Sequence, residues 1–408
     1  MVQSKDKEFH IRILSSLSED QTREVLKAVR VDHYAIDILM PKMRHLNILL
    51  KDIECKVANI IKQEMLAVGG DAAVARGTVA CSISATDVML MGTEKQIKQF
   101  LIHITAQPFG LKSLSHQLED QLTNYFAKEP VLFTNRRELN LTGRTHIMGI
   151  INVTPDSFSD GGQYYSTQSA IDQARKLEAE GADFLDVGGE SSRPGSDFVS
   201  LQEEMDRVIP VLKGLAGKVK IPISVDTIKS EVAEAAIAEG AEIINDISAM
   251  TFDARMASVI AKNKAAVVLM HMRGLPKTMQ EGPIIYGDLM GSIIGYLAQQ
   301  IKMARTGGIR SESIILDPGI GFGKTVDNNL KIINCLSELK IFGMPILTGV
   351  SRKSFTGTIT GTTIPAERSE GTAAAITATI LNGSHIVRVH DVAAAKKIAA
   401  MADAIIRN

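Results

Sequence analysis

The stretch Ile147-Met-Gly-Ile-Ile-Asn-Val-Thr-Pro-Asp-Ser-Phe-Ser-Asp-Gly-Gly162 decides the fold of this chain. Its apolar, β-branched first half predicts a buried strand, and Asn152, Pro155 and the Gly-Gly pair predict that this strand ends abruptly in a polar loop. The same design recurs down the chain, where apolar runs end in an acid, an amide or a cation. Such a series predicts a parallel sheet whose polar groups gather at one end.

From His146 onward, strand, loop and helix alternate. Candidate strands span 146–152, 184–188, 221–226, 242–246, 265–271, 313–317, 345–350 and 385–390, and helices between them include 168–180, 230–239, 290–306, 328–339 and 369–382. Eight buried strands alternating with helices over about 260 residues predict an α/β fold, the (β/α)₈ TIM barrel. The other architecture open to this pattern is a doubly wound sheet, but the nucleotide fingerprint expected at its first turn is missing.

The chain of 408 residues is long enough for such a barrel and a smaller unit. We expect an N-terminal α+β domain of unknown role over residues 1–135, a linker over 136–145 and the barrel over 146–408. Strands are predicted at 9–14, 46–50 and 87–91, and helices after 18–20, at 55–67 and from about 93 and 113. No catalytic constellation stands out in this domain.

Composition excludes several kinds of partner. A formal net charge of −1 gives no electrostatic footprint for nucleic acid or an anionic membrane, and the absence of Trp argues against a base-stacking platform. Three scattered cysteines indicate a reducing compartment, and no stretch is typical of a secretory signal or a membrane span. We therefore expect a cytoplasmic protein whose ligands are small molecules.

Polar residues close every candidate strand of the barrel, and active sites of this fold lie at that end. Asp226, Asn245 and Asp317 supply acceptors and an amide, which suit a donor-rich heterocycle such as a 2-aminopyrimidinone. A single Asp or Asn at a strand end is often only a cap or turn residue, but that reading does not explain polar closure of all eight strands.

The strand ends also carry cationic side chains, which form a second set of candidate ligand-binding residues beside the acids and the amide. Arg388 and His390 lie two apart in one strand and so share a face, and together with Arg193 they suit a polyanion. Lys353 could serve either set. Lys324 ends a Gly-rich segment that fails the spacing of a phosphate-binding loop, and the sequence leaves open whether its side chain is solvated or functional.

Eight segments resemble the dihydropteroate synthase family. They are NVTPDSFSDGG (152–162), DVGGESSRPG (186–195), SVDT (224–227), IND (244–246), MHMRGLPKTMQ (270–280), DPGIGFGK (317–324), GVSRK (349–353) and RVHDV (388–392). Each alone is moderately specific, whereas all of them in this order over residues 146–408 are highly specific. Ser192 stands where the family usually has Thr, so the hydroxyl is kept and one methyl is lost.

The resemblance implies condensation of 6-hydroxymethyl-7,8-dihydropterin diphosphate with 4-aminobenzoate, giving dihydropteroate and pyrophosphate in folate biosynthesis. Carried onto matching positions, it implies that Asp226, Asn245, Asp317, Lys353 and Met270 hold the pterin, that Asn152 binds Mg²⁺, and that Arg193, Arg388 and His390 hold the diphosphate. It also implies that Ser192, Pro194, Phe322, Ser351 and Arg352 surround the aminobenzoate. Asp317, Lys353, Arg388 and His390 are the implied catalytic residues, and the segments 154–162 and 191–197 the implied lids.

Two other functions are compatible with such a barrel. A methyltransferase that passes a methyl group from methyltetrahydrofolate to a corrinoid protein would share the pterin-holding acids but does not need a diphosphate site. A non-catalytic pterin-binding protein would be expected to lose some diphosphate or metal groups. Since the motifs retain the diphosphate and metal groups, the synthase is favoured. The resemblance also implies a homodimer.

Overall fold

The computed structural model describes residues 11–14, 18–127, 130–153, 162–191, 195–274 and 276–407. The chain forms two compact units, Met1–Leu122 and Thr123–Asn408. Each unit has its own hydrophobic core, so each is described by itself.

The N-terminal unit is an α+β fold around a three-stranded antiparallel sheet in the order β1-β3-β2. Its elements are α1 Glu19–Ala28, α2 His33–Met43, β1 His45–Glu54, α3 Cys55–Ala67, β2 Asp71–Val74, β3 Ala85–Thr93, α4 Glu94–Thr105 and the start of α5, Leu111–Phe126. Two helices begin with a capping box, in which Ser18 pairs with Gln21 and Thr93 with Gln96. Buried side chains of α3, α4, β1 and β3 form the core, among them Ile61, Phe100 and Leu90.

The predictions for this unit are mostly confirmed at the level of elements. The helix expected at 55–67 coincides with α3, and the strands expected at 46–50 and 87–91 lie within β1 and β3. Residues 11–14 of the strand expected at 9–14 carry no regular structure, and the other two lie outside the described residues. The sequence reading also missed α2 and the short strand β2.

The second unit is a parallel barrel, as predicted. Within the described part of the chain its eight strands are β6 His146–Asn152, β7 Phe184–Gly188, β8 Ile223–Asp226, β9 Ile243–Asp246, β10 Ala266–Met270, β11 Ile314–Asp317, β12 Leu347–Thr348 and β13 Ile386–Val389. They pair in the order β11-β10-β9-β8-β7-β6-β13-β12, and one parallel bridge between Leu316 and Ile346 joins the two ends. β12 is shorter than the predicted 345–350, because Pro345 has no N–H to donate and the ladder with β13 covers only two residues.

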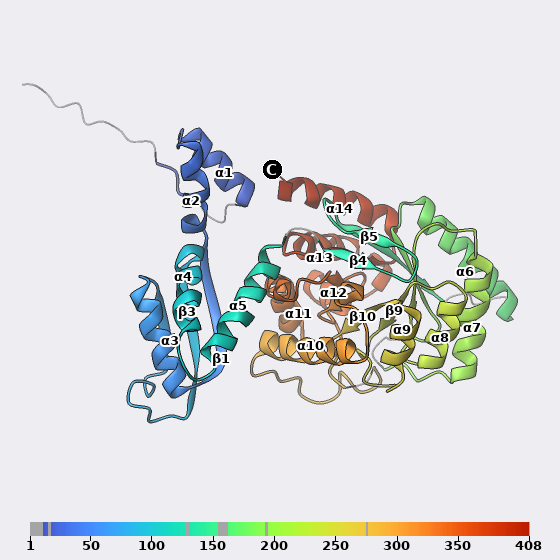
Figure 1. Ribbon diagram of the computed structural model, residues 1–408. Coiled ribbons are helices and arrows are strands. Elements are labelled where there is room, and N and C mark those ends of the chain that lie inside the picture. The colour runs from blue at the N-terminus through green and yellow to red at the C-terminus, as the bar shows by residue number, and fades with distance from the viewer. Residues whose placement is uncertain are drawn as a thin grey trace, which may run out of the picture. The chain divides into compact units, whose positions relative to one another are not determined.

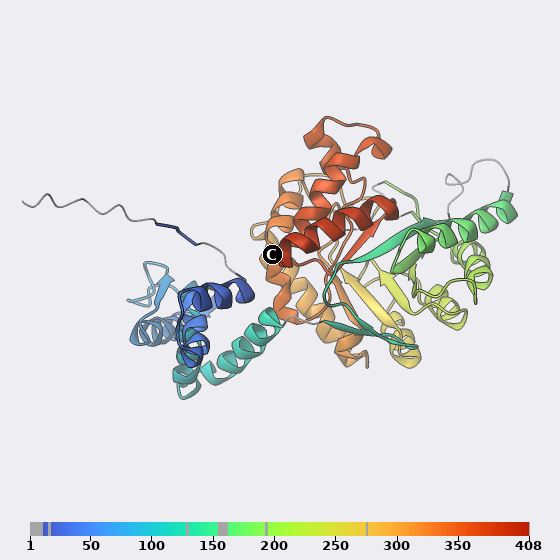
Figure 2. The ribbon, with the colours of Figure 1, turned by 90° about the horizontal axis from the view of Figure 1, so that it is seen from above.

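Helices surround the strands in both views (Figures 1 and 2). They are α6 Gly162–Ala179, α7 Leu201–Leu215, α8 Ser230–Ala238, α9 Met256–Asn263, α10 Leu289–Thr306, α11 Val326–Asn334, α12 Ser354–Thr360, α13 Ser369–Leu381 and α14 Val392–Arg407, with 3₁₀ turns at Ser311–Ser313, Leu336–Phe342 and Pro365–Glu367. Outward-facing strand residues such as Leu185 and Val187 pack against the helices in one continuous core.

Inward-facing residues follow the two-residue period of a strand. Along β7 these are Phe184, Asp186 and Gly188; Phe184 belongs to the apolar core inside the barrel, and Asp186 is the first polar residue above it. β13 repeats this order with Ile386, Arg388 and then His390 just past its end. The barrel interior therefore changes from apolar to polar toward the carboxyl ends of its strands.

A β-hairpin precedes the barrel and packs onto the apolar end of its interior. It comprises β4 Val131–Phe133 and β5 Glu138–Asn140, and its Leu132 and Leu141 are buried with Met148 and Phe184. Thr134 and Arg137 anchor it to the buried Glu242 with bonds of 2.8 and 2.7 Å. The segment 136–145 was expected to be a linker, but it contains β5 and part of this core, and the chain divides earlier, after Leu122.

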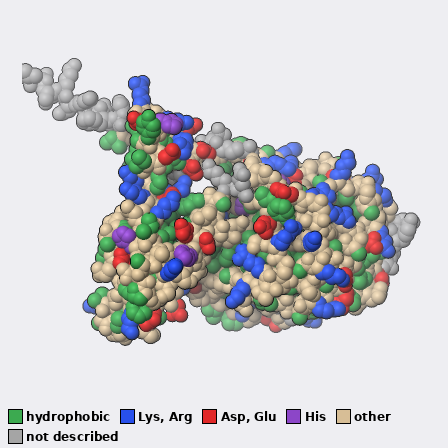
Figure 3. All heavy atoms as spheres, viewed as in Figure 1, with side chains coloured by type: hydrophobic (Ala, Val, Ile, Leu, Met, Phe, Trp, Pro, Cys, Tyr) green, Lys and Arg blue, Asp and Glu red, His purple; other side chains and the backbone are tan. Residues whose placement is uncertain are grey.

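The visible face of the barrel unit carries Lys and Arg interspersed with Asp and Glu (Figure 3). This mixed surface accords with the formal net charge of −1. No helix in the described ranges is long and apolar enough to cross a membrane.

Candidate active site

Arg388 links two acidic side chains inside the barrel. Its Nε donates to Oδ2 of Asp186 at 2.6 Å, and its Nη2 donates to Oδ2 of Asp226 at 2.9 Å. The amide of Asn245 donates to the same Asp186 oxygen at 3.0 Å. These four side chains come from β13, β7, β8 and β9, so one polar network spans half of the ring of strands.

Asp226 sits in this network as an acid that holds its proton tightly. Burial raises the pKa of Asp226 to about 7 against the opposing effect of Arg388, and the carboxylates of Asp186, Glu204 and Asp246 add to the rise. A carboxyl group with such a pKa changes charge near neutral pH. The network can therefore respond to a ligand that donates N–H groups to it.

Asp317 ends β11 and fixes the turn that follows. Its Oδ1 accepts a bond of 2.7 Å from the N–H of Gly319, which has a positive φ of 69° and lies so close to the carbonyl oxygen of His271 that a Cβ there would be 1.9 Å from it. Burial raises the pKa of Asp317, while Lys353 and Lys324 favour its ionised form. This turn leaves the Asp317 carboxyl at the end of β11, only 7% exposed.

Lys353 stands over an aromatic ring beside these acids. Its Nζ lies 4.1 Å from the centroid of the Phe322 ring. Burial lowers the pKa of Lys353 to about 8, and the negative charges of Asp317 and Asp226 oppose this shift. The Lys353 charge is therefore favoured by the two acids, while its ammonium lies against the Phe322 ring.

An apolar cluster completes this part of the site. It comprises Ile228, Ile247, Met270, Met279 and Phe322, which are all buried. Met270 is the last residue of β10, and the other four follow β8, β9, β10 and β11 along the chain. Apolar faces beside a set of acceptors suit a flat heterocycle with N–H groups on its edge.

Asn152, Arg352 and His390 line one cavity of about 680 Å³, together with residues of α6 that include Asp172 and Lys176. The His390 Nδ1 and the Ser351 hydroxyl lie 3.0 Å apart, and the His390 N–H also donates to that hydroxyl at 3.3 Å. The ends of β6, β12 and β13 thus bring four of the expected site residues together.

Three expected residues, Ser192, Arg193 and Pro194, lie outside the described residues, as do positions 154–161 of the first expected lid. No group of three or more His, Cys, Asp or Glu side chains among the described residues could hold a metal ion. In the N-terminal unit, the ring of His103 pairs with Glu64 at 3.1 Å and is partly exposed.

Lys324 is buried and bonded on three sides, so its side chain is not solvated. Its ammonium donates to the carbonyl oxygens of His271 and Phe322 at 3.1 and 3.0 Å and lies 3.1 Å from Nδ1 of His271. Burial lowers the pKa of His271 to about 3, and the Lys324 charge acts in the same direction, so the ring is neutral near pH 7. Burial also lowers the pKa of Lys324, to about 7, against the opposing charge of Asp317. Lys324 therefore ties the end of β10 to the loop after β11.

Asp186 is the residue that the sequence reading missed. It is fully buried in the middle of β7, whereas the residues that predict the site lie at the ends of strands. A charged residue inside an otherwise apolar strand was the signal that could have found it. Asp246, by contrast, caps the turn after β9 by accepting from Ser248 and Met250, so it has a structural role.

Comparisons with known proteins identify the family of the chain. The profile of the family described as "Pterin binding enzyme" matches residues 148–390. A dihydropteroate synthase of Synechocystis sp. is 46% identical over 288 residues, covering 71% of this chain and 99% of that protein. One of Bacillus subtilis is 44% identical over 276 residues, covering 68% and 94%.

Solved structures give the same result. The dihydropteroate synthase of Xanthomonas albilineans with 4-aminobenzoic acid matches with a TM-score of 0.64 and 40% identity, over 68% of this chain and 98% of that one. The same enzyme in complex with 7,8-dihydropteroate matches with a TM-score of 0.61 and 38% identity, over the same shares of both chains. The chain therefore belongs to the dihydropteroate synthases, the pterin-binding transferases of folate biosynthesis.

Proposed function

We propose that the acidic network and the apolar cluster together hold the pterin ring of 6-hydroxymethyl-7,8-dihydropterin diphosphate. Asp226, Asn245 and Asp317 offer acceptors to the ring's N–H groups. Met270 packs against the face of the ring, and Lys353 balances the acids. The observation that carries this proposal is the burial of three acceptors from β8, β9 and β11 beside one apolar cluster.

The diphosphate would extend toward Arg388, His390 and Arg193. His390 lines the large cavity with Asn152, and Ser351 orients its ring through Nδ1. Arg388 carries five N–H donors, and two of its nitrogens bond the aspartates. A bound diphosphate would share this cation, so Arg388 couples the pterin end of the site to the phosphate end.

The residues present fit a bound Mg²⁺ at Asn152. Its carboxamide supplies an oxygen donor at the rim of the cavity, and Mg²⁺ is commonly held by one or two protein oxygens with waters and substrate phosphates filling the rest. When bound, Mg²⁺ would neutralise charge on the leaving pyrophosphate. This metal site is part of the proposal.

The chain's residues favour charge separation rather than supplying a nucleophile. The C–O bond to the diphosphate breaks, and the methylene carbon becomes a cation that the electron-rich pterin stabilises. Asp317 and Asp226 beside the ring lower the energy of that cation, while Arg388 and His390 stabilise the departing anion. The aminobenzoate nitrogen then attacks the methylene carbon, and its proton leaves to water.

The 4-aminobenzoate would lie beside the Phe322 ring, Ser351 and Arg352. Ser192 and Pro194 complete this set in the proposal, although they lie outside the described residues. The backbone of Phe322 is held because its carbonyl oxygen accepts a hydrogen bond from Lys324, and the Lys353 ammonium lies over its ring. A second substrate bound there would be next to the methylene carbon.

We also propose a homodimer formed through outer helices of the barrel. Large apolar side chains are exposed on α11, α12, α13 and α14, among them Leu330, Ile359, Leu381 and Met401. Sedimentation velocity tests this, with a monomer at micromolar concentration as the contrary result. The cytoplasmic location stays a prediction from the sequence.

A pyrophosphate-release assay tests the function directly. With the pterin diphosphate, 4-aminobenzoate and Mg²⁺, the protein should release pyrophosphate and form dihydropteroate, and omission of 4-aminobenzoate should prevent dihydropteroate formation. Asn152→Ala should raise the Mg²⁺ concentration needed for half-maximal rate. An unchanged Mg²⁺ requirement would remove Asn152 from the proposal.

A further inference from the structure

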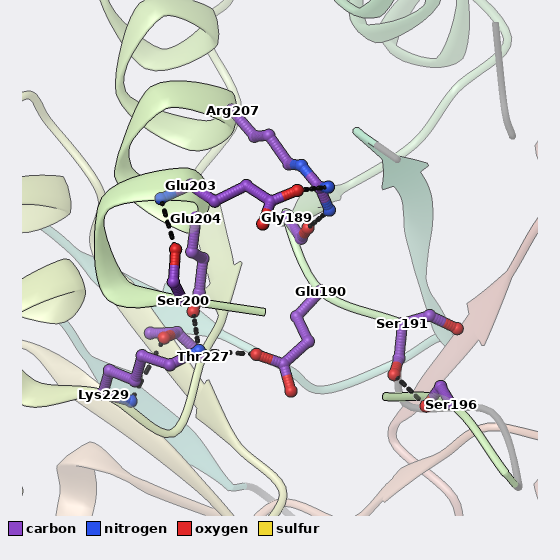
Figure 4. A network of polar contacts seen from close by, with 10 residues as sticks. All are labelled: Gly189, Glu190, Ser191, Ser196, Ser200, Glu203, Glu204, Arg207, Thr227 and Lys229. Carbon is purple, nitrogen blue, oxygen red and sulfur yellow. Dashed lines mark hydrogen bonds and ion pairs between the residues drawn. The ribbon is translucent and has the colours of Figure 1, made fainter. Parts of the chain in front are cut away.

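Lys229 connects two segments that follow neighbouring strands of the barrel. It lies just before α8, three residues after Asp226, and its side chain is 13% exposed. The ammonium Nζ lies 2.5 Å from Oε2 of Glu190, which follows β7, and also bonds Oε2 of Glu204 in the first turn of α7 (Figure 4). One cation thus joins the end of β7, the start of α7 and the turn after β8.

A second cation holds the same segment. Arg207 of α7 donates to the carbonyl oxygen of Gly189 at 2.7 Å and also pairs with Glu203 (Figure 4). Gly189 lies close to α7, where a Cβ would come within 2.8 Å of Val208. The backbone at residues 189 and 190 is therefore held to α7 by packing, by Arg207 and by Lys229.

Glu204 makes Lys229 essential to the charge balance of this region. The Glu204 side chain is 1% exposed, and its Oε1 has no hydrogen-bond partner among the described residues. Without Lys229, Glu204 would be a buried carboxylate with no cation, which is strongly unfavourable. Glu190 is 16% exposed and would lose its only described cationic partner.

This network adjoins the pterin end of the site. Glu190, Glu204, Asp226 and Thr227 line one small cavity of about 20 Å³, and the Lys229 N–H donates to the hydroxyl of Thr227 at 3.2 Å. Arg388 joins the same two strands from inside the barrel through Asp186 and Asp226. Arg388 thus bonds Asp226 directly, and Lys229 bonds the residue that follows it, Thr227.

We propose that Lys229 is a positioning residue of the synthase reaction, which acts by holding Glu190 and the turn after β8 so that Asp226 faces the pterin. This inference rests on the proposed role of Asp226 as a pterin acceptor. Lys229 itself touches neither substrate in this account. A displacement of about 1 Å at a group that positions a substrate can lower the reaction rate on the order of 100-fold. The effect of losing Lys229 should therefore be measurable.

The test compares Lys229→Met, Lys229→Arg and the double variant Lys229→Met/Glu204→Gln. The double variant removes the buried uncompensated charge, so its melting temperature should return close to that of the wild type. If Lys229 positions Asp226, the dissociation constant of 6-hydroxymethylpterin, measured by its fluorescence, should stay raised by roughly 10- to 100-fold in the double variant, which is the effect of losing a hydrogen bond to a charged group. Lys229→Arg should recover most of the affinity because it keeps both ion pairs.

Two further variants keep the result interpretable. Glu190→Gln should also weaken pterin binding with little change in melting temperature, even if Lys229→Met fails to fold. Lys262→Met is the matched control, because Lys262 makes an exposed pair with Glu234 of α8 at 3.3 Å. Wild-type affinity in both the double variant and Glu190→Gln would overturn the inference and leave Lys229 a structural residue.

Asp226→Asn separates this inference from the function on which it rests. If Asp226→Asn binds the pterin as tightly as the wild type, the proposed role of Asp226 fails, and the inference fails with it. If Asp226→Asn loses binding while the double variant and Glu190→Gln keep it, the inference alone fails.

Discussion

The Nε of Arg388 lies 2.6 Å from Oδ2 of Asp186, so the last strand of the barrel is bonded to the second across the interior. Asp186 is fully buried, and the guanidinium is its cationic partner in the described chain. Arg388→Met should therefore leave a buried carboxylate without compensation and cost roughly 3–5 kcal/mol in the free energy of unfolding. Urea denaturation of the barrel unit measures this loss.

The matched controls separate charge from packing. Asp186→Asn/Arg388→Met should recover part of the lost stability, because no uncompensated Asp186 charge remains. Arg305→Met, which removes an exposed bond to Ser311, should change stability by less than about 0.5 kcal/mol. A stability loss from Arg388→Met no larger than that of Arg305→Met would contradict this account of the pair.

The raised pKa of Asp226 predicts a pH dependence of stability and binding. With a pKa of about 7 in the folded protein, Asp226 keeps its proton at pH values at which the unfolded chain has lost it. Its contribution to the free energy of unfolding should thus fall as pH rises from about 4 to about 7, and level off above. Ionised Asp226 is the better acceptor, so pterin affinity should fall as pH drops below 7.

The affinity for 6-hydroxymethylpterin, measured as a function of pH, tests this pH dependence. This ligand has no phosphate group whose own titration would contribute. The charged groups around Asp226 are Arg388, Asp186, Glu204 and Asp246, and Asp226→Asn should abolish the inflection near pH 7. If the inflection persists unchanged in Asp226→Asn, it belongs to another group or to the ligand.

Lys324 should contribute to stability through the two carbonyl groups it bonds. Lys324→Met leaves the carbonyl oxygens of His271 and Phe322 without this donor, at a cost of roughly 1–3 kcal/mol for each one left unsatisfied. Because Phe322 would shift, KM for 4-aminobenzoate should also rise. Lys331→Met, at an exposed position on α11, is the control. Equal melting temperatures for the two variants would refute the structural role of Lys324.

The β4–β5 hairpin should be required for an isolated barrel. A fragment of residues 123–408 keeps Leu132 and Leu141 in the barrel's inner core, whereas a fragment of 146–408 exposes Met148, Phe184 and their neighbours. We expect the longer fragment to fold and release pyrophosphate and the shorter one to aggregate. Size-exclusion chromatography and the activity assay measure both, and a monodisperse, active shorter fragment would contradict the role of the hairpin.

The sequence predicts the barrel well because its signals are local. Apolar runs bounded by polar turn residues mark β6 and β7 at their observed limits, and strand-end acids mark Asp226 and Asp317. The hairpin was missed because three-residue strands carry almost no periodic signal and are set by packing against the barrel. The short strand β2 was missed for the same reason, since pairing with β3 defines it.

The sequence does not show which side chains of the site pair with one another. Its residues divided into acids for the ring and cations for the diphosphate, yet Arg388 bonds the acids directly. Which cation meets which acid depends on strand stagger and inward orientation around the closed barrel, and these are tertiary properties. The same limit applies to two lysines. Lys324 pairs with His271, 53 residues away in the sequence, and Lys229 pairs with Glu190, 39 residues away.

The binding of pterin diphosphate to Asp317→Ala, measured by isothermal titration calorimetry, tests the central claim most directly. Asp317 is the acceptor fixed by the turn after β11, so its loss should abolish measurable binding and pyrophosphate release, while circular dichroism shows a folded barrel. Near-normal affinity and turnover in a folded Asp317→Ala protein would contradict the placement of the pterin at the carboxyl end of the barrel.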